Sequence, residues 1–140
     1  MTNVATEFNS GYWQNILGSQ LMRVLVIDDE QIIRNMLSAY LTKQGYEVQT
    51  AENGEEGTTI FYQDPNLFNL IITDLQMPKM NGIEFLTKIR GDGYNTPAVV
   101  VTGHLHLAES EEINALQVMQ LVNKPFKLSL IKSLIDKLPH

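Results

Sequence analysis

The chain has 140 residues, of which 44% are hydrophobic and 19% are charged, and these values predict one folded domain with its own core. Its formal net charge of −6 argues against a nucleic-acid-binding protein that works by neutralising phosphates. The sequence contains no cysteine, which excludes disulfides, thiolate metal sites and cysteine nucleophiles.

The amino-terminal part of the chain differs from the rest. Residues 1–20 contain no Lys or Arg and are rich in Asn, Ser, Thr and Gly. They predict a tail, either disordered or with a short helix in which Trp13, Ile16 and Leu17 share one face. They lack the pattern of a signal peptide, and no apolar stretch approaches the roughly 20 residues needed to cross a bilayer. We therefore expect a cytoplasmic protein without membrane contacts, whose domain spans residues 21–140.

From residue 22 onward, strand patterns and helix patterns alternate five times. The expected strands are short apolar or alternating runs at residues 24–27, 46–51, 68–73, 98–101 and 118–122. The expected helices lie in the segments 32–41, 54–63, 83–89, 105–116 and 131–138. Such alternation predicts an α/β domain with right-handed crossovers and a parallel sheet covered by helices on both faces.

Side chains that carry chemistry follow four of these strands. Asp28 and Asp29 follow the first strand, Asp74 the third, Thr102 the fourth and Lys124 the last. In open parallel sheets, ligands bind at the carboxyl ends of the strands, so these groups should meet at one edge. A carboxylate can attack phosphorus, Mg²⁺ prefers oxygen ligands, and a hydroxyl and an ammonium can bind phosphoryl oxygens. The set therefore predicts phosphoryl chemistry.

Each of these residues also has an ordinary structural explanation. Asp28 and Asp29 suit the start of the next helix, and Asp74 suits a turn. The functional interpretation depends on the set, because such residues follow several different strands at once. His104 and His106 lie one residue apart without a clear third ligand, and we interpret them as polar loop residues rather than a metal site.

Four segments at the strand ends form a recognisable pattern, of which the second is the most specific: VLVIDDE (24–30), DLQMPKMNG (74–82), VTG (101–103) and NKPF (123–126). With these segments, the residues from about 22 to 138 resemble the receiver domain of two-component response regulators. The resemblance implies a flavodoxin-like (βα)5 fold, with a doubly wound five-stranded parallel sheet in the order 2-1-3-4-5.

The resemblance also implies a metal site and a phosphoacceptor. Asp74 would accept the phosphoryl group. Asp29, Asp74 and the backbone carbonyl of Gln76 would bind Mg²⁺ directly, and Asp28 would act through a water molecule. The usual phosphoryl donor of the family is a phosphohistidine on a sensor histidine kinase or a histidine phosphotransfer protein.

Two further positions concern the response to phosphorylation. Thr102 would be the switch hydroxyl, and Lys124 would pair with the phosphoryl group. Receivers commonly carry an aromatic residue three positions before this lysine, and that residue turns inward when the hydroxyl engages the phosphoryl group. Here the position is Leu121, so the usual coupling to Thr102 is altered.

We therefore expect a phosphorylation-dependent signalling switch that binds a downstream protein through residues 105–126, as a monomer or weak dimer, without contacting nucleic acid directly. It would not be an enzyme beyond its own phosphorylation and dephosphorylation. Three alternatives remain. The chain is the receiver part of a longer response regulator or hybrid kinase, a degenerate receiver used only for binding, or a small aspartyl-phosphate phosphohydrolase. Phosphohydrolases of this kind place a second Asp two residues after the nucleophile, where this chain has Gln76.

Overall fold

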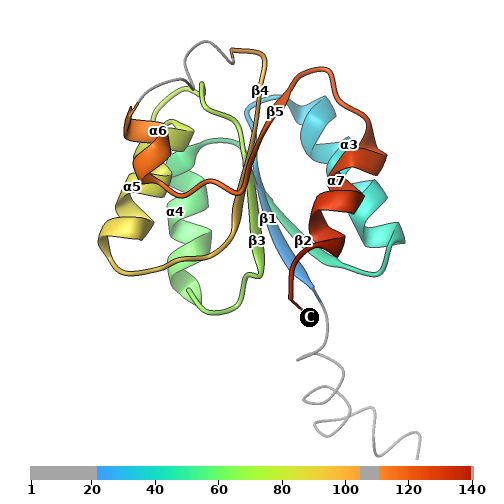
Figure 1. Cartoon of the computed structure of the whole chain (residues 1–140), viewed down its shortest axis with the longest axis horizontal. Coiled ribbons are helices and arrows are strands. Elements are labelled where there is room, and N and C mark those ends of the chain that lie inside the picture. The colour runs from blue at the N-terminus through green and yellow to red at the C-terminus, as the bar shows by residue number, and fades with distance from the viewer. Residues whose placement is uncertain (1–21, 105–110, 140) are drawn as a thin grey trace, which may run out of the picture.

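Five parallel strands form the centre of the computed structural model, which describes residues 22–104 and 111–139 (Figure 1). The sheet order is β2-β1-β3-β4-β5, which confirms the expected order and the flavodoxin-like architecture. The strands are β1 (Arg23–Ile27), β2 (Glu47–Ala51), β3 (Leu70–Thr73), β4 (Ala98–Thr102) and β5 (Gln120–Asn123). The helices are α3 (Gln31–Lys43), α4 (Gly54–Gln63), α5 (Gly82–Gly91), α6 (Glu111–Ala115) and α7 (Leu128–Asp136).

Helices cover both faces of the sheet. Figure 1 shows α3 and α7 on one face and α4, α5 and α6 on the other. Alternate side chains of the central strands enter two separate cores, because successive residues of a strand point to opposite faces. Leu25 and Ile27 of β1 belong to the core on the α4–α5–α6 side, whereas Val24 and Val26 belong to the core under α3 and α7. The continuous apolar strands of the sequence are thus explained by burial on two faces.

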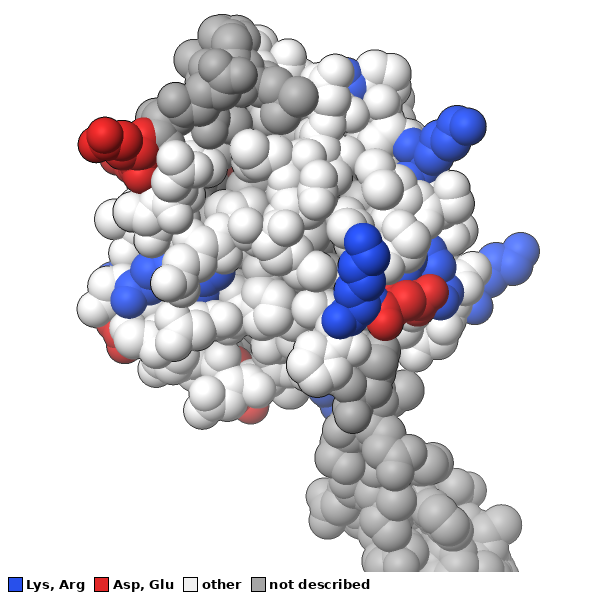
Figure 2. Space-filling view, in the orientation of Figure 1, with Lys and Arg blue, Asp and Glu red and all other residues white. Residues whose placement is uncertain are grey.

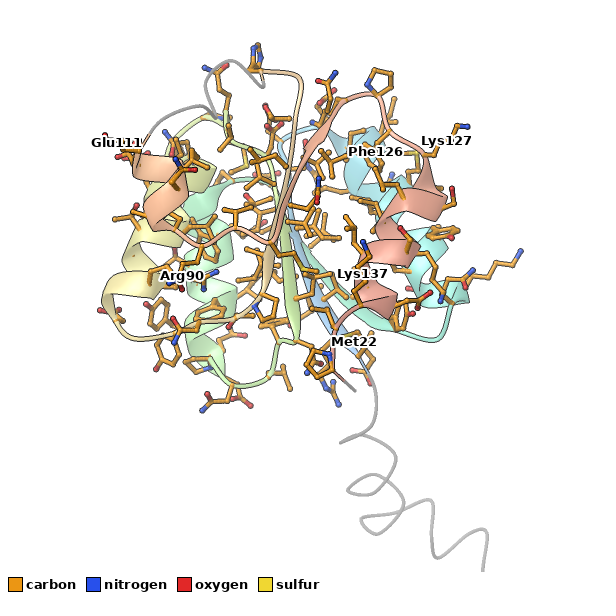
Figure 3. The ribbon with its side chains drawn as sticks, viewed as in Figure 1. Met22, Arg90, Glu111, Phe126, Lys127 and Lys137 are labelled. Atoms are coloured by element: carbon orange, nitrogen blue, oxygen red, sulfur yellow. The ribbon has the colours of Figure 1, made fainter. Side chains whose placement is uncertain are left out.

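The register of the strands brings their carboxyl ends to one level. Ile27 of β1 is paired with Thr73 of β3, so Asp28 and Asp74 follow at the same height. Thr102 of β4 is paired with Asn123 of β5, so Lys124 follows directly beyond that pair. In Figure 3, Phe126 and Lys127 mark this edge of the sheet, and Met22 marks the opposite edge.

Local sequence signals account for several helix ends. The Asn53 side chain accepts a hydrogen bond from the Glu56 amide (2.8 Å) and caps α4, a position that favours Asn. Asn81 and Glu84 form a reciprocal capping box at the start of α5. These caps fix the points at which two of the loops beside the strand ends turn into helix.

Some predicted boundaries differ from the structure. The last strand was expected at 118–122 but spans Gln120–Asn123, because the chain first turns through Gln117, whose φ is 56°. The third strand begins at Leu70 rather than 68. The expected helix 105–116 is described only from Glu111 to Ala115, and residues 105–110, the expected tail 1–20 and His106 lie outside the described residues. Among the helices of the described part, none is long and apolar enough to cross a membrane.

Candidate functional site

A cavity of about 570 Å³ opens at the carboxyl edge of the sheet. It is formed by the loops that follow β1, β3, β4 and β5, as expected for an open parallel sheet. The residues that line it are Asp29, Glu30, Asp74, Gln76, Met77, Pro78, Asn81, Gly103, His104 and Lys124. The sequence prediction that these strand ends meet is therefore confirmed.

Asp28 is buried directly beneath the cavity, and both of its carboxylate oxygens are engaged. Oδ1 accepts a hydrogen bond from the Glu30 amide (2.9 Å), and Oδ2 contacts Lys124 Nζ (2.8 Å). Its backbone carbonyl accepts a bond from Arg34 Nη1 (2.8 Å), which ties the loop to α3. Burial raises the pKa of the Asp28 carboxyl above its ordinary value, although the bonds from Lys124 and Glu30 partly counteract this effect.

Asp74 directly follows β3, and its side chain is 7% exposed. Oδ1 accepts backbone hydrogen bonds from Leu75 (2.6 Å) and Gln76 (3.3 Å), while Oδ2 accepts one from Lys124 Nζ (2.8 Å). The backbone amide of Asp74 donates to the Ile27 carbonyl (3.0 Å), which continues the ladder between β1 and β3. The carboxylate is thus fixed in orientation at the floor of the cavity.

Lys124 contacts three carboxylates at once. Its Nζ lies 2.8 Å from Asp28 Oδ2, 2.8 Å from Asp74 Oδ2 and 2.7 Å from Glu30 Oε1. Burial of the amine opposes its ionisation, but the hydrogen bonds to the three acids outweigh this and raise the pKa of Lys124 above its ordinary value. The lysine is therefore a fixed positive charge beside the Asp74 carboxylate.

Thr102 ends β4 and is fully buried, so it does not itself line the cavity. Its Oγ1 accepts a hydrogen bond from the His104 amide (3.0 Å), and its backbone carbonyl accepts one from the Lys124 amide (2.9 Å). Because Oγ1 is the acceptor in that bond, the hydroxyl proton can be donated to another oxygen. Leu121 lies elsewhere: it is half-buried on β5, is paired with Val100 and packs against the core on the α4–α5–α6 side.

The acidic side chains offer a set of oxygen donors suited to a divalent cation. Carboxylate oxygens of Asp28, Glu30 and Asp74 all lie within 4.8 Å of one another. Hard cations such as Mg²⁺ prefer such ligands, so the residues fit the expected metal. Asp29 and Gln76 line the same cavity but do not belong to this close group of acids. The sequence groups Glu30 with Asp28 and Asp29 as an acidic run, and its contact with Lys124 is seen only in the structure.

Two glycines allow the loops to approach the site closely. A Cβ on Gly82 would lie 2.0 Å from the Asp74 carbonyl oxygen, and a Cβ on Gly54 would lie 2.4 Å from the Met80 carbonyl oxygen. The Gly54 amide instead donates to that Met80 carbonyl (2.7 Å), which joins the start of α4 to the loop after β3. No local feature of the sequence indicates the backbone contact between Gly82 and Asp74.

Away from the cavity, the half-buried Arg90 links α5 to the segment that follows α6. Arg90 of α5 donates from Nε to the carbonyl of Leu116, beyond the end of α6 (2.9 Å), and from Nη1 to the carbonyl of Tyr94 (2.9 Å) (Figure 3). Burial lowers the pKa of Arg90. The arrangement anchors the α6–β5 connection to α5.

Comparison with known proteins gives consistent matches. The model of the response regulator receiver domain matches residues 24–136. Response regulator RR06 of Streptococcus pneumoniae is 35% identical over 122 residues, which cover 84% of this chain and 52% of RR06. The chain spans about half or less of the length of the curated relatives it matches.

Solved structures agree with the sequence matches. The Vibrio cholerae chemotaxis protein CheY4 has a TM-score of 0.76 at 30% identity, covering 85% of this chain and 99% of CheY4. Response regulator TrrA of Thermotoga maritima, solved in complex with Mg²⁺ and BeF, has a TM-score of 0.75 at 34% identity, covering 85% of this chain and all of TrrA.

Proposed function

The chain belongs to the response regulator receiver family of two-component signalling, and from this premise we propose that Asp74 is the phosphoacceptor of a phosphorylation-dependent switch. The observation that carries the proposal is the position of the Asp74 carboxylate. It lies at the floor of the cavity, with one oxygen held by backbone amides and the other in contact with Lys124. This arrangement presents a negatively charged nucleophile next to a fixed positive charge.

In the proposed reaction, a carboxylate oxygen of Asp74 attacks the phosphorus of a phosphohistidine on a kinase or phosphotransfer protein. A P–O bond to Asp74 forms as the P–N bond breaks, and the imidazole nitrogen keeps the electron pair and takes up a proton. Hydrolysis reverses the state: water attacks phosphorus, the P–O bond to Asp74 breaks, and the carboxylate and inorganic phosphate are released. Both steps depend more on positioning and charge than on covalent help from the protein.

Mg²⁺ is the proposed cofactor, held by Asp29, Asp74 and the Gln76 carbonyl directly and by Asp28 through water. The group of carboxylate oxygens around Asp74, and the place of Asp29 and Gln76 in the cavity lining, support this assignment. When bound, the cation would neutralise charge between the acids and the phosphoryl oxygens. The TrrA complex with Mg²⁺ and BeF provides a precedent within the family.

Lys124 and Thr102 are the proposed partners of the phosphoryl group. The Lys124 ammonium already contacts Asp74 Oδ2 and would pair with a phosphoryl oxygen at the same place. The Thr102 hydroxyl can donate a hydrogen bond, because its oxygen is the acceptor of the His104 amide. A phosphoryl group that binds these residues better in one conformation shifts the population toward that conformation.

Signal output is proposed to occur by protein contact on the face that contains residues 105–126. Figure 2 views this side of the molecule, around β5 and α7, and the middle of the described surface carries few charged side chains. Leu121 occupies the position in this region that is commonly aromatic in the family. It has no ring or hydroxyl, so it would respond to a change at Thr102 only by a change in its packing. We further propose that residues 21–140 form the receiver domain, that residues 1–20 are a tail outside it, and that the protein is a monomer or weak dimer.

The phosphohydrolase alternative is less well supported by the site. It needs an acid or base two residues after the nucleophile, and the amide of Gln76 cannot take or give a proton near neutral pH. The groups that contact the Asp74 carboxylate are backbone amides and Lys124, which support its proposed role as a phosphoacceptor.

Mass spectrometry after incubation with Mg²⁺ and a small acyl phosphate tests the proposal. The wild-type protein should gain the mass of one phosphoryl group, and Asp74→Asn should gain none. Asp64→Asn is the matched control, because Asp64 is exposed at the end of α4 and should be labelled like wild type. Labelling that persists in Asp74→Asn would refute the assignment.

A further inference from the structure

The ion pair between Glu30 and Lys124 joins residues 94 positions apart. Glu30 differs from the other two carboxylates around the lysine in its exposure to solvent. The side chains of Asp28 and Asp74 are 4% and 7% exposed, whereas that of Glu30 is 58% exposed. Building on the proposed role of Asp74, we propose that Glu30 is a positioning residue that holds the Lys124 ammonium at the mouth of the cavity, directed toward Asp74.

Glu30 occupies a helix N-cap position that does not usually favour glutamate. Glu30 is the N-cap residue of α3, a position that favours Asn, Asp, Ser or Thr. Its side chain makes no capping hydrogen bond, and its Oε1 lies 2.7 Å from Lys124 Nζ instead. The carboxylate thus binds a distant lysine instead of capping its own helix. Such departures from local preference are often found at functional sites.

The hydrogen bonds around Lys124 show why a third acid is useful. An ammonium group has three donors, and the three carboxylates provide one acceptor each. Asp28 and Asp74 are each held at Oδ1 by backbone amides, so only their Oδ2 atoms face the lysine. Glu30 therefore completes the set from the solvent side, and Lys124 is left only 13% exposed.

Phosphorylation changes one partner of Lys124, the Asp74 carboxylate, but not Glu30. When the Asp74 carboxylate becomes an acyl phosphate, it loses its own charge, and its pairing with Lys124 passes to the phosphoryl oxygens. Glu30 lies outside the reacting group and keeps its contact with the lysine. It thus restrains a long, flexible side chain that would otherwise lose side-chain entropy each time it bound the phosphoryl group.

A double-mutant cycle tests whether Glu30 acts through Lys124. The initial rate of labelling of Asp74 by a small acyl phosphate with Mg²⁺ is measured for wild type, Glu30→Gln, Lys124→Gln and the double variant. Glu30→Gln should slow labelling about two- to fivefold, the range expected for a partly exposed ion pair. In the Lys124→Gln background the same change should have no further effect, because contacting residues are not additive.

The matched control and a second measurement separate the possible failures. Glu52→Gln removes an exposed acid just past the end of β2 and should be labelled at the wild-type rate. The ammonium signal of Lys124 in ¹⁵N NMR should show faster proton exchange with water in Glu30→Gln but not in Glu52→Gln, whether or not Asp74 is phosphorylated.

If wild type is never labelled while the NMR difference appears, the function assigned to Asp74 fails and the contact of Glu30 with Lys124 stands. Unchanged labelling in Glu30→Gln, an equal slowing in the Lys124→Gln background, or unchanged ammonium exchange would each overturn the role of Glu30.

Discussion

Replacement of Gly82 by alanine should slow phosphorylation strongly and also destabilise the fold. The new Cβ would lie 2.0 Å from the Asp74 carbonyl oxygen and 3.0 Å from its carbonyl carbon. Since real Cβ contacts are not shorter than 3.0 Å, the start of α5 or the end of β3 must move by roughly 1 Å. The crowded backbone carbonyl belongs to the same residue as the proposed nucleophilic carboxylate.

The effects on stability and on the rate of labelling can be estimated separately. Overpacking costs about 1–3 kcal/mol of stability, and the better helix propensity of alanine offsets up to about 1 kcal/mol of that loss. A displacement of roughly 1 Å in a reacting group can lower the rate about 100-fold. We therefore expect a net loss of up to about 3 kcal/mol in the free energy of unfolding, with labelling of Asp74 about 100-fold slower.

Gly91→Ala provides a matched control on the same helix. A Cβ on Gly91 meets no atom within 4 Å, so this variant should be labelled at the wild-type rate and gain up to roughly 1 kcal/mol of stability. Urea unfolding measures stability, and mass spectrometry follows labelling by a small acyl phosphate. If Gly82→Ala is labelled as fast as Gly91→Ala, the close approach of α5 to Asp74 is not a constraint on the reaction.

Three further outcomes are expected. Because burial raises the pKa of Asp28 above 3.8, the folded state binds this proton more tightly, and stability should fall as pH rises through the raised pKa. In denaturation experiments without divalent cations, the free energy of unfolding of Asp28→Asn should not show this dependence on pH. At pH 7 the variant should be more stable than wild type. Gln117→Gly should raise the free energy of unfolding by about 0.5–1 kcal/mol in the same assay, since φ is 56° there; a loss would contradict this. With Leu121 at the altered position, a phosphoryl mimic should shift amide NMR signals near Thr102 but few across α6; broad changes across α6 would show that the usual coupling operates.

The sequence predicted the fold well because the relevant signals are local and repeated. Apolar runs bounded by turn residues identify strands, and Asn53 identifies a helix start through its own capping geometry. Alternation of the two then leaves few topologies, of which the observed order is one. The start of the last strand lies two residues later than predicted, because a left-handed residue, Gln117, precedes it without a glycine to indicate the turn.

Within the site, the sequence by itself determined which chemical groups stand at the strand ends, because each follows an apolar run that must be buried in a parallel sheet. Asp28, Asp74 and Lys124 can therefore be identified from the sequence alone. Only the tertiary structure decided how those groups are paired. The contact of Lys124 with Glu30 spans 94 residues, and the approach of Gly82 to Asp74 depends on the angle at which α5 leaves its loop. Such contacts depend on packing between elements, which has no periodic or local signature in the chain.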